Sequence, residues 1–576
     1  MQVLSLTINN FRGIKEFAQT FDSSNVVCFV GRGDSCKTTI LQAINFVLYP
    51  QRWISIEDKD FYKGNVDEPI KIEIAIGKFS KEIFKDLCRD DTYGGFIHKW
   101  DEKMKTSLEL WSEDSGDSED QSCLKINFSV DKNLEPVWVV VSSNGTDTKV
   151  LHASDRAKFN SYLIEDYHDK HFTLGKGSPL MNLYKNQSSS FKDDVALQQI
   201  VRDIQLKLTD KKGDIFDPDF IKFCADLKVK LSKFNVNMSG EIIPSIVAQS
   251  FHTNNTNFII ADDNGPLQSK GKGTKRLSSI AIQTQLSNNV TLVDEVEQGL
   301  EPDRIKSLIS SLEKEASSKD SNVGQIFLTT HSRDVLVELK STDIYIIRNN
   351  DGVLTVIHPT STDQGTVRRN PEALFGKKVL VCEGSTELGF IRAFENYRYR
   401  NNQDKLSYLG VVIVDGGGTS LVNYLDSYLK WSFPSMLLCD SDEKNLNSEK
   451  DRLRKAGLEI VEWEHNLCLE QVVALELPWD KILELLKLAC TYKSEQSIYD
   501  SINNGEATPL DKDISKWVES EGLREKIGEK MNSGSWFKTH SKGEDLGDVI
   551  FNCFDLLPAT SQIKTKVEQM TEWVKK

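Results

Sequence analysis

The sequence has 576 residues, of which 39% are apolar and 27% are charged, and its formal net charge is −15. This balance predicts a globular protein of two or more domains, in which any contact with nucleic acid depends on local basic patches. No apolar run reaches the length of a membrane span, no secretory leader is recognisable, and the cysteines form no C-x-x-C pair. We therefore expect a cytoplasmic protein with reduced thiols, no structural zinc and no membrane contact.

A phosphate-binding loop is predicted close to the N-terminus. After an alternating strand at Val3–Ile8, a second strand at Val26–Val30 runs into Gly31-Arg32-Gly33-Asp34-Ser35-Cys36-Lys37-Thr38-Thr39, and a helix follows. In a P-loop, backbone N–H groups cradle the phosphates, the lysine reaches the β- and γ-phosphates, and the hydroxyl after it binds Mg²⁺. Cys36 stands where the pattern has its second glycine, and Asp34 adds a negative charge. We expect ATP to contact Gly31, Gly33, Ser35, Lys37, Thr38 and Thr39, and whether ATP is hydrolysed is left open.

The interval that follows the loop shows no heptad repeat, so a long coiled coil is excluded. It begins with mixed strands, and from Phe159 to Phe234 its pattern is largely helical. We expect a helical insertion at about 159–250 that could form a dimer interface. Its lysine-rich stretches, Lys207–Lys212 and Lys222–Lys233, fit a solvated helical face better than a DNA-contacting one.

Further nucleotide motifs follow in the order that an ABC-type ATPase head requires. Ser269-Lys270-Gly271-Lys272-Gly273 precedes a helical pattern and is interpreted as a signature loop, which binds the γ-phosphate of a nucleotide held by a second subunit. Val290–Val293 runs into Asp294 and Glu295, expected to hold Mg²⁺ through water and to orient the attacking water. A D-loop is expected at Gly299–Pro302, and His331 after the strand Gln325–Thr329 is expected to sense the γ-phosphate.

A hairpin and a linker are predicted to end the first half. Ile344–Ile347 and Val353–Ile357 flank an Asn-Asp-Gly turn, which is typical of a β-hairpin. The following residues are rich in Ser, Thr and Arg, with a proline at each end and no apolar period. We therefore predict an ATPase domain at 1–358 and a linker at 359–376.

The second half contains short apolar runs that end at carboxylates. Lys378–Cys382 ends at Glu383, with Glu387 one helical turn later, and Met436–Cys439 ends at Asp440 and Asp442. Between them, Leu409–Val414 ends at Asp415 and three glycines. Parallel strands deliver such side chains to one edge of a sheet, and oxygen ligands suit Mg²⁺ or Mn²⁺. The pattern predicts a two-metal site acting on phosphodiesters.

Two weaker sets of candidates lie further on. Glu464 and Glu470 follow a fourth strand at Leu458–Trp463, and Glu470 is preferred as an additional metal ligand. The remaining sequence reads as helices interrupted near Trp536-Phe537-Lys538. A lysine there could neutralise charge on the reacting phosphate, and Lys538 is preferred to Lys542. We predict a nuclease domain at 377–480 completed by a helical extension at 481–576.

The E-G-x-x-E and D-x-D pattern resembles the Toprim domain. An ABC-type ATPase head followed by such a domain is similar to the OLD (overcoming lysogenisation defect) nuclease family, and this resemblance spans nearly the whole chain. It implies an α/β protein that cuts DNA with divalent metals and dimerises, or forms a higher oligomer, through its ATPase portion. It also implies a role in bacterial defence against phage, with a helicase or a reverse-transcriptase/RNA partner. The resemblance places nuclease acids at Glu383, Glu387, Asp440 and Asp442. Together with the candidates above, we predict Glu383, Asp440, Asp442 and one of Lys538 and Lys542 as catalytic residues, and Glu383, Glu387, Asp440, Asp442 and Glu470 as metal ligands.

Two other functions remain compatible with these motifs. A nucleotide-dependent DNA clamp or scaffold with an inert Toprim domain predicts DNA binding without strand breaks. A strand-passing topoisomerase needs a tyrosine in a separate cleavage module, and none is recognisable around Tyr424 or Tyr428.

Overall fold

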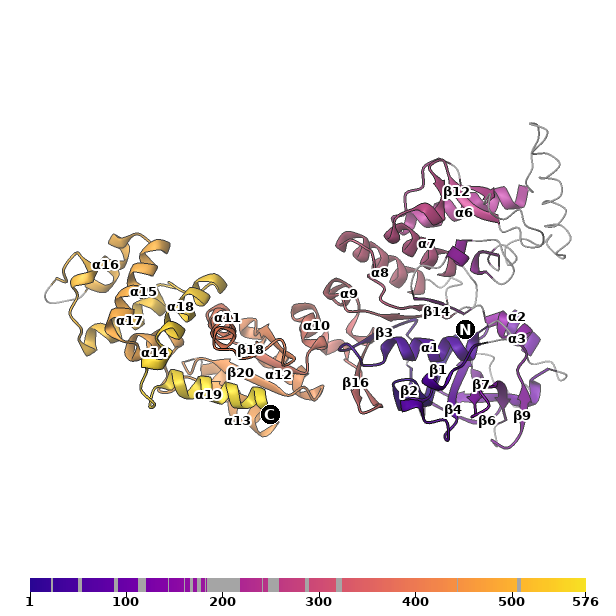
Figure 1. Ribbon diagram of the computed structural model, residues 1–576, viewed down its shortest axis with the longest axis horizontal. Coiled ribbons are helices and arrows are strands. Elements are labelled where there is room, and N and C mark those ends of the chain that lie inside the picture. The colour runs from indigo at the N-terminus through magenta and orange to yellow at the C-terminus, as the bar shows by residue number, and fades with distance from the viewer. Residues whose placement is uncertain are drawn as a thin grey trace. The chain divides into compact units, whose positions relative to one another are not determined.

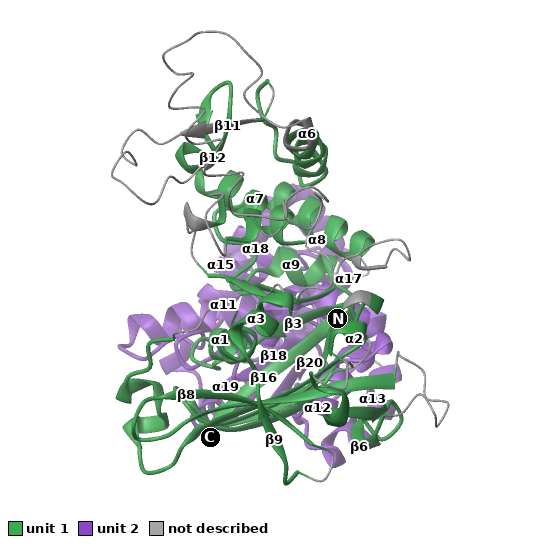
Figure 2. Cartoon of the chain, turned by 90° about the vertical axis from the view of Figure 1, so that its right-hand side faces the viewer, with its two compact units in different colours: residues 1–358 green, residues 359–576 purple. Residues whose placement is uncertain are grey.

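The chain folds into two compact units, Met1–His358 and Pro359–Lys576, which are coloured separately in Figure 2. The computed structural model describes residues 1–21, 24–49, 54–87, 92–111, 121–142, 145–159, 161–165, 169–172, 178–181, 183, 218–240, 242–246, 258–284, 290–317, 324–442, 444–504 and 509–576. The expected α/β class is confirmed, since each unit combines a sheet with helices. The units are described separately below.

The first unit is built on a sheet of 14 strands within its described residues. Its nucleotide-binding side is parallel, in the order β10(Tyr162–Ile164), β14(Val290–Val293), β15(Gln325–Thr329), β3(Val26–Val30) and β16(Ile344–Asn350). The sheet continues through β17(Val353–Ile357), β2(Ile14–Thr20), β1(Gln2–Phe11), β4(Ile70–Gly77), β7(Ser122–Val130), β5(Ile97–Asp101) and β6(Thr106–Leu110), with β8(Pro136–Val141) and β9(Thr148–Val150) beside β7. The predicted hairpin is confirmed, because β16 and β17 pair antiparallel around Asp351 and Gly352, both with positive φ.

The phosphate loop joins the carboxyl end of β3 to the helix α1, and both elements are labelled in Figure 1. Helix α1(Lys37–Leu48) follows β3 and packs Ile40, Ile44 and Val47 into the same apolar core as Phe29 of β3 and Leu292 of β14. Three more helices surround the nucleotide motifs: α7(Lys272–Thr284), α8(Pro302–Ser317) and α9(Arg333–Glu338).

The expected helical insertion is only partly helical where it is described. Residues 162–164 form β10, which joins the large sheet beside β14, and Asp294 donates its backbone N–H to the carbonyl of Ile164 at 2.9 Å. The short apolar run fits a parallel edge strand, so the expectation of helix there was wrong. Helix α6(Pro218–Lys233) and strands β11(Ile243–Ile246), β12(Phe258–Asp262) and β13(Gly265–Pro266) are also described, and Lys207–Lys212 lies outside the described residues.

The second unit is built on a parallel sheet with the strand order β19-β18-β20-β21. The strands are β18(Lys378–Cys382), β19(Val411–Asp415), β20(Ser435–Cys439) and β21(Glu459–Glu462), and helices α11(Ser385–Arg400), α12(Leu421–Lys430) and α13(Lys444–Lys455) connect them. The predicted parallel strands are therefore confirmed. Since β18 lies between β19 and β20, Glu383 ends the strand at the centre of the acidic edge.

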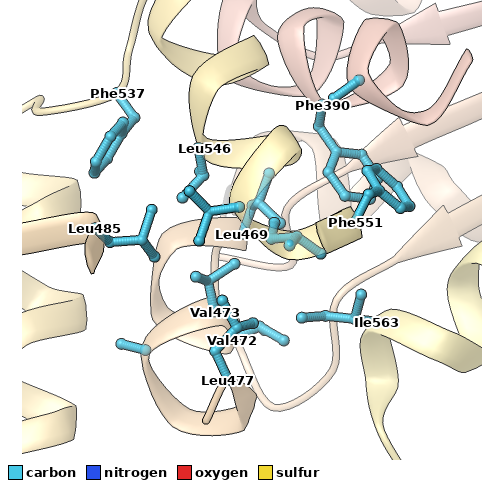
Figure 3. Close-up of a cluster of buried hydrophobic side chains, with 14 of the residues drawn as sticks. Phe390, Leu469, Val472, Val473, Leu477, Leu485, Phe537, Leu546, Phe551 and Ile563 are labelled. Atoms are coloured by element: carbon cyan, nitrogen blue, oxygen red, sulfur yellow. The ribbon is translucent and has the colours of Figure 1, made fainter. Parts of the chain in front are cut away.

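The C-terminal helices share one core with this sheet. They are α14(Leu469–Glu476), α15(Trp479–Tyr492), α16(Glu495–Asn503), α17(Glu521–Ser533), α18(His540–Asn552) and α19(Gln562–Lys575). Figure 3 shows Phe551 and Leu546 of α18 in the cluster that contains Phe390 of α11 and Val473 of α14. The rings of Phe390 and Phe551 lie 5.2 Å apart between centroids. These helices are thus part of the same folded unit as the acidic strand edge.

Two glycines allow α11 and α18 to touch through their backbones. A Cβ on Gly389 would lie 2.3 Å from the backbone nitrogen of Glu544, and one on Gly543 would lie 2.7 Å from the carbonyl oxygen of Thr386. Both distances are far below a normal contact, so no side chain fits at either position. The close approach fixes the start of α18 beside the first turn of α11.

The segment predicted as a linker, 359–376, is folded onto the second unit. It forms the short helices η11(Ser361–Asp363), α10(Gln364–Arg369) and η12(Pro371–Phe375). Asp363 caps this turn by accepting from the backbone N–H of Thr360 at 2.7 Å, and its other oxygen accepts from the hydroxyl of Ser427 on α12 at 3.0 Å. These hydrogen bonds stabilise a segment whose sequence has no apolar periodicity. The prediction that it is a linker was therefore wrong.

Candidate active site

Glu383 and Asp440 meet where β18 and β20 end. The Oε2 atom of Glu383 accepts the backbone N–H of Asp440 at 2.9 Å, and the backbone N–H of Glu383 donates to the carbonyl of Leu438 at 3.0 Å. The two acids are 57 positions apart in the sequence. Parallel pairing of β18 with β20 brings them together, as the strand-end argument predicts.

Two further carboxylates, Glu387 and Glu470, are buried against this pair. Glu387 lies in the first turn of α11 and Glu470 in the first turn of α14, and their exposed fractions are 4% and 1%. Burial, followed by the charges of Glu470 and Glu383, raises the pKa of Glu387 from 4.5 to about 7. Burial, followed by the charges of Glu387, Glu470 and Glu383, raises the pKa of Asp440 from 3.8 to about 9. The four groups therefore repel one another when they are ionised, and both burial and this repulsion favour protonation of Glu387 and Asp440.

The donor set fits divalent cations in its chemistry. Three of the acids each bind one backbone N–H: Glu383 that of Asp440, Glu387 that of Gly384 at 3.0 Å, and Asp440 that of Leu469 at 3.0 Å. The Oε1 atom of Glu470 is buried without a hydrogen-bond partner. Among the described residues, no three His, Cys, Asp or Glu side chains form a closed chelating group. Carboxylates that are oriented by backbone N–H groups, together with a buried oxygen that lacks a hydrogen-bond donor, are suitable ligands for Mg²⁺ or Mn²⁺.

The other predicted acids lie at the edge of this group or outside it. Asp442 is exposed, and its charge contributes least among the named neighbours that raise the pKa of Asp440. Glu464 is exposed and pairs with Lys566 at 2.9 Å. The structure thus brings Glu383, Glu387, Asp440 and Glu470 together, with Asp442 at the rim.

The two candidate lysines have different surroundings. Lys538 is exposed and follows Phe537, whose carbonyl lies 3.5 Å from the hydroxyl of Thr386 on α11. Lys542 is half-buried, and its ammonium lies 4.8 Å from the centroid of the Tyr492 ring. Lys538 is therefore next in sequence to Phe537, which contacts the first turn of α11. Lys542 instead lies over the ring of Tyr492.

In the first unit, the P-loop and the strand after the signature helix share one hydrogen-bond network. The ammonium of Lys37 donates to the carbonyls of Gly31 and Arg32 and to the hydroxyl of Ser35, at 2.9–3.2 Å. The hydroxyl of Thr38 donates to both carboxylate oxygens of Asp294, at 2.9 and 3.0 Å. A hydroxyl and a carboxylate in contact at the start of α1 are a suitable donor set for the Mg²⁺ of a nucleotide.

Cys36 adopts the backbone conformation that glycine favours. Its φ is 63° and its ψ is 22°, and its thiol contacts the carbonyl of Gly13 at 3.4 Å and the side-chain nitrogen of Asn349 at 3.5 Å. Left-handed backbone at a residue with a Cβ costs about 1–2 kcal/mol. The loop therefore keeps its shape despite the substitution, and the thiol points toward neighbouring loops of the same unit.

The remaining nucleotide motifs lie around the same strand ends. Gly273 lies inside α7, whereas the sequence predicted it before the helix, and a Cβ on it would lie 2.4 Å from the carbonyl of Gly299 in the predicted D-loop. Ser269 and Gly271 precede α7. Partial burial and the charge of Lys37 lower the pKa of His331. This effect of Lys37 indicates that His331 lies near the P-loop lysine.

Two groups of site residues were not predicted from the sequence. Glu165 follows β10 and contacts Gln42 of α1, while buried Arg276 of α7 donates to the carbonyls of Glu165 and Glu295. The rule that an apolar run ends at a carboxylate could have found Glu165. In the second unit, Arg369 of α10 pairs with Asp415 beside Glu383, and no sequence signal distinguishes it from its neighbour Arg368.

Two protein-family descriptions match the two halves of this chain. The family described as "AAA ATPase domain" matches residues 1–336, which is more than half of the chain. The chain belongs to the AAA ATPase domain family. The TOPRIM domain described as "Overcoming lysogenization defect protein-like" matches residues 374–442, the stretch that holds Glu383, Glu387, Asp440 and Asp442. The predicted combination of an ATPase head with an OLD-like Toprim domain is confirmed, and the ATPase family implies ATP as its nucleotide.

Individual relatives of this ATPase–Toprim chain are distant. "Endonuclease GajA" from Bacillus cereus (strain VD045) is 20% identical over 503 residues, covering 80% of this chain and 78% of the relative. The Smc head bound to the C-winged helix domain of ScpA is 15% identical with a TM-score of 0.36, covering 62% of this chain and 97% of that one. An Smc head from Pyrococcus furiosus is 16% identical with a TM-score of 0.41, covering 64% and 99%. Within the described ranges, every helix is too short or too polar to cross a bilayer.

Proposed function

We propose that this protein is a metal-dependent DNA endonuclease regulated by ATP binding. The observation that carries the proposal is the convergence of Glu383, Glu387, Asp440 and Glu470 at one strand edge of an OLD-like Toprim domain. Buried carboxylates that raise one another's pKa are tolerated in a fold when cations neutralise them. The distant relative GajA, described as an endonuclease, supports DNA as the substrate.

Bound Mg²⁺ or Mn²⁺ would supply Lewis acidity and a water of lowered pKa for in-line attack on a phosphodiester. Glu383 and Asp440 would hold the ions, and the backbone N–H that each carboxylate accepts fixes its orientation. Glu387 and Glu470 would complete the set from α11 and α14, and Asp442 would act at the rim. Lys538 would stabilise charge on the reacting phosphate from the loop before α18.

The first unit is proposed to bind ATP through Lys37, Thr38 and Asp294, and to control DNA access rather than to turn ATP over rapidly. Gly31 and Gly33 shape the loop, with Ser35 and Thr39 beside the lysine and threonine. The signature residues Ser269, Gly271 and Gly273 would meet the nucleotide of a second copy in a homodimer or higher oligomer. Glu295 would orient the attacking water and His331 would sense the γ-phosphate of the nucleotide bound to their own copy. We infer a role in anti-phage defence, alongside a helicase or reverse-transcriptase/RNA partner, from the family resemblance.

A nicking assay on supercoiled plasmid with Mg²⁺ or Mn²⁺ tests the nuclease proposal. The wild-type protein is expected to nick, and Glu383→Ala and Asp440→Ala are expected to lose nicking. Glu464→Gln is the matched control, because Glu464 is an exposed acid of the same unit outside the carboxylate group. Unchanged nicking in Glu383→Ala and Asp440→Ala would disprove the assignment. DNA binding without strand breaks in the wild type would favour the clamp or scaffold function instead.

A further inference from the structure

A cavity of about 450 Å³ opens beside Glu383 in the second unit. It lies at the carboxyl ends of β18 and β19, whereas Asp440 follows β20 on the other side of β18. Glu383 thus belongs to both the cavity and the carboxylate group. A cavity of this size accommodates a ligand the size of a nucleotide.

The walls of the cavity combine an aromatic ring, an ion pair and exposed backbone. Tyr424 of α12 contributes the ring, and Arg369 pairs with the carboxylate of Asp415. The ring is seated against Gly417, where a Cβ would lie 3.0 Å from its Cε2 atom. Gly417 and Gly418 both have positive φ, so this wall presents backbone rather than side chains.

The polar groups of the cavity are held in place by the surrounding backbone. Asp415 accepts the backbone N–H of Gly417 at 2.9 Å, and its carbonyl accepts the side-chain N–H of Asn370 at 3.0 Å. The backbone N–H of Gly416 donates to the carbonyl of Cys382 at the end of β18. A fixed carboxylate beside a guanidinium offers one acceptor and several donors in a set geometry.

The charges that line the cavity indicate which part of a nucleotide it can bind. Glu383 and Asp415 are negative and Arg369 is positive, so the cavity does not favour a phosphate. A nucleobase is neutral, carries donors and acceptors on one edge and has faces that stack on aromatic rings. We propose that the cavity binds one base of the DNA strand being cut, turned out of its stack, next to the phosphate that the carboxylate group holds. This proposal rests on the proposed nuclease function.

In the bound state, the base stacks on Tyr424, and its edge meets Asp415 and Arg369. The sugar–phosphate backbone then passes Ser385 at the start of α11, where a 16-residue helix presents its first N–H groups. Glu383 stands between the base and the scissile phosphate. The cavity therefore fixes the register of the strand relative to the carboxylates.

An abasic-site scan tests the proposal through binding alone. Full-length protein carrying Asp440→Ala, which blocks cleavage, is titrated with fluorescent duplexes in Ca²⁺, each lacking one base at successive positions. At one position, loss of the base is expected to weaken binding roughly ten-fold. The same lesion is expected to have no further effect when Arg369→Ala or Tyr424→Ala is added, whereas Tyr424→Phe keeps the ring and the sensitivity.

Arg368→Ala is the matched control, because Arg368 is an exposed arginine of the same helix that does not line the cavity. It is expected to preserve the ten-fold effect. The base-binding proposal is overturned if no position is sensitive, or if sensitivity persists in both Arg369→Ala and Tyr424→Ala proteins with unchanged thermal unfolding. Nicking by the wild-type protein is measured separately. A protein that nicks but shows no sensitive position refutes the cavity alone, and one that shows the position but never nicks refutes the nuclease function.

Discussion

Replacing Glu470 with glutamine should stabilise the protein in the absence of metal and remove most of its response to metal. Keeping Glu387 ionised at pH 8, against a pKa raised from 4.5 to about 7, costs about 3 kcal/mol. Burial accounts for the largest part of that cost, and the charge of Glu470 is the next cause. Glutamine has the same shape without the charge and can donate to a neighbouring carboxylate. Relief at Glu387 and Asp440 together should be roughly 1–3 kcal/mol, or about 2–4 °C in Tm for each kcal/mol.

The assay follows thermal unfolding of the full-length protein at pH 8 with and without Mn²⁺. Wild-type protein should gain stability from Mn²⁺, and the Glu470→Gln protein should start from a higher Tm and gain little. The reasoning would be refuted if Glu470→Gln lowered the Tm without metal, or if its Mn²⁺ response equalled that of the wild type. Glu459→Gln removes an exposed carboxylate of the same unit whose partner, Lys576, is also exposed at 3.6 Å, and it should change neither quantity by more than about 0.5 kcal/mol.

The pH dependence of stability without metal has a definite sign. Glu387 and Asp440 have folded pKa values of about 7 and about 9, both above their usual values of 4.5 and 3.8. Protons therefore bind the folded state more tightly than the unfolded one, and stability falls as pH rises from about 4 toward 9. Metal binding requires deprotonated ligands, so the Tm increase from Mn²⁺ should be larger at pH 8 than at pH 6. An equal increase at both values would contradict the raised pKa values.

Three other substitutions test particular contacts. Cys36→Gly removes a left-handed residue with a Cβ and should raise the free energy of unfolding by about 1 kcal/mol, and a lower Tm would mean that the thiol contacts outweigh the strain. Lys538→Ala should slow single-turnover nicking by about 10²-fold while Lys542→Ala stays within a few-fold, and the reverse order would exchange their roles. Gly389→Ala should destabilise the second unit by about 1–3 kcal/mol in denaturant unfolding, because its Cβ overlaps the backbone of α18. Gly522→Ala in α17 meets no atom within 4 Å and is the matched control.

The parts of the fold that the sequence predicted are those where one short pattern determines the local structure. Apolar runs ending at Glu383 and Asp440 indicated parallel strands, and pairing in the sheet then places those acids together without further information. The glycine-rich loop before Lys37 similarly identified its strand and helix. Burial of Glu470 was not predictable in this way, because it depends on how α14 packs against the sheet.

Features that depend on packing between distant segments were missed. The segment around Asp363 lacks an apolar period, yet it folds because its capping bonds reach Ser427, which is 64 positions away. β10 is so short that hydrophobic periodicity cannot distinguish a strand from a helix there. Its pairing with β14 determines that it is a strand. Arg369 could be recognised as a site residue only from its ion pair with Asp415, and the position of Asp415 depends on the pairing of β19 in the sheet.

The backbone contact between α11 and α18 limits how the proposed nuclease site could be switched. The contact at Gly389 and Gly543 holds the start of α18, which follows Lys538, against the first turn of α11, which contains Glu387. In the proposed nuclease, these groups would therefore already stand together in the resting protein. Control by the ATPase unit would then have to act on whether a DNA strand reaches these groups. It would not have to bring the groups together.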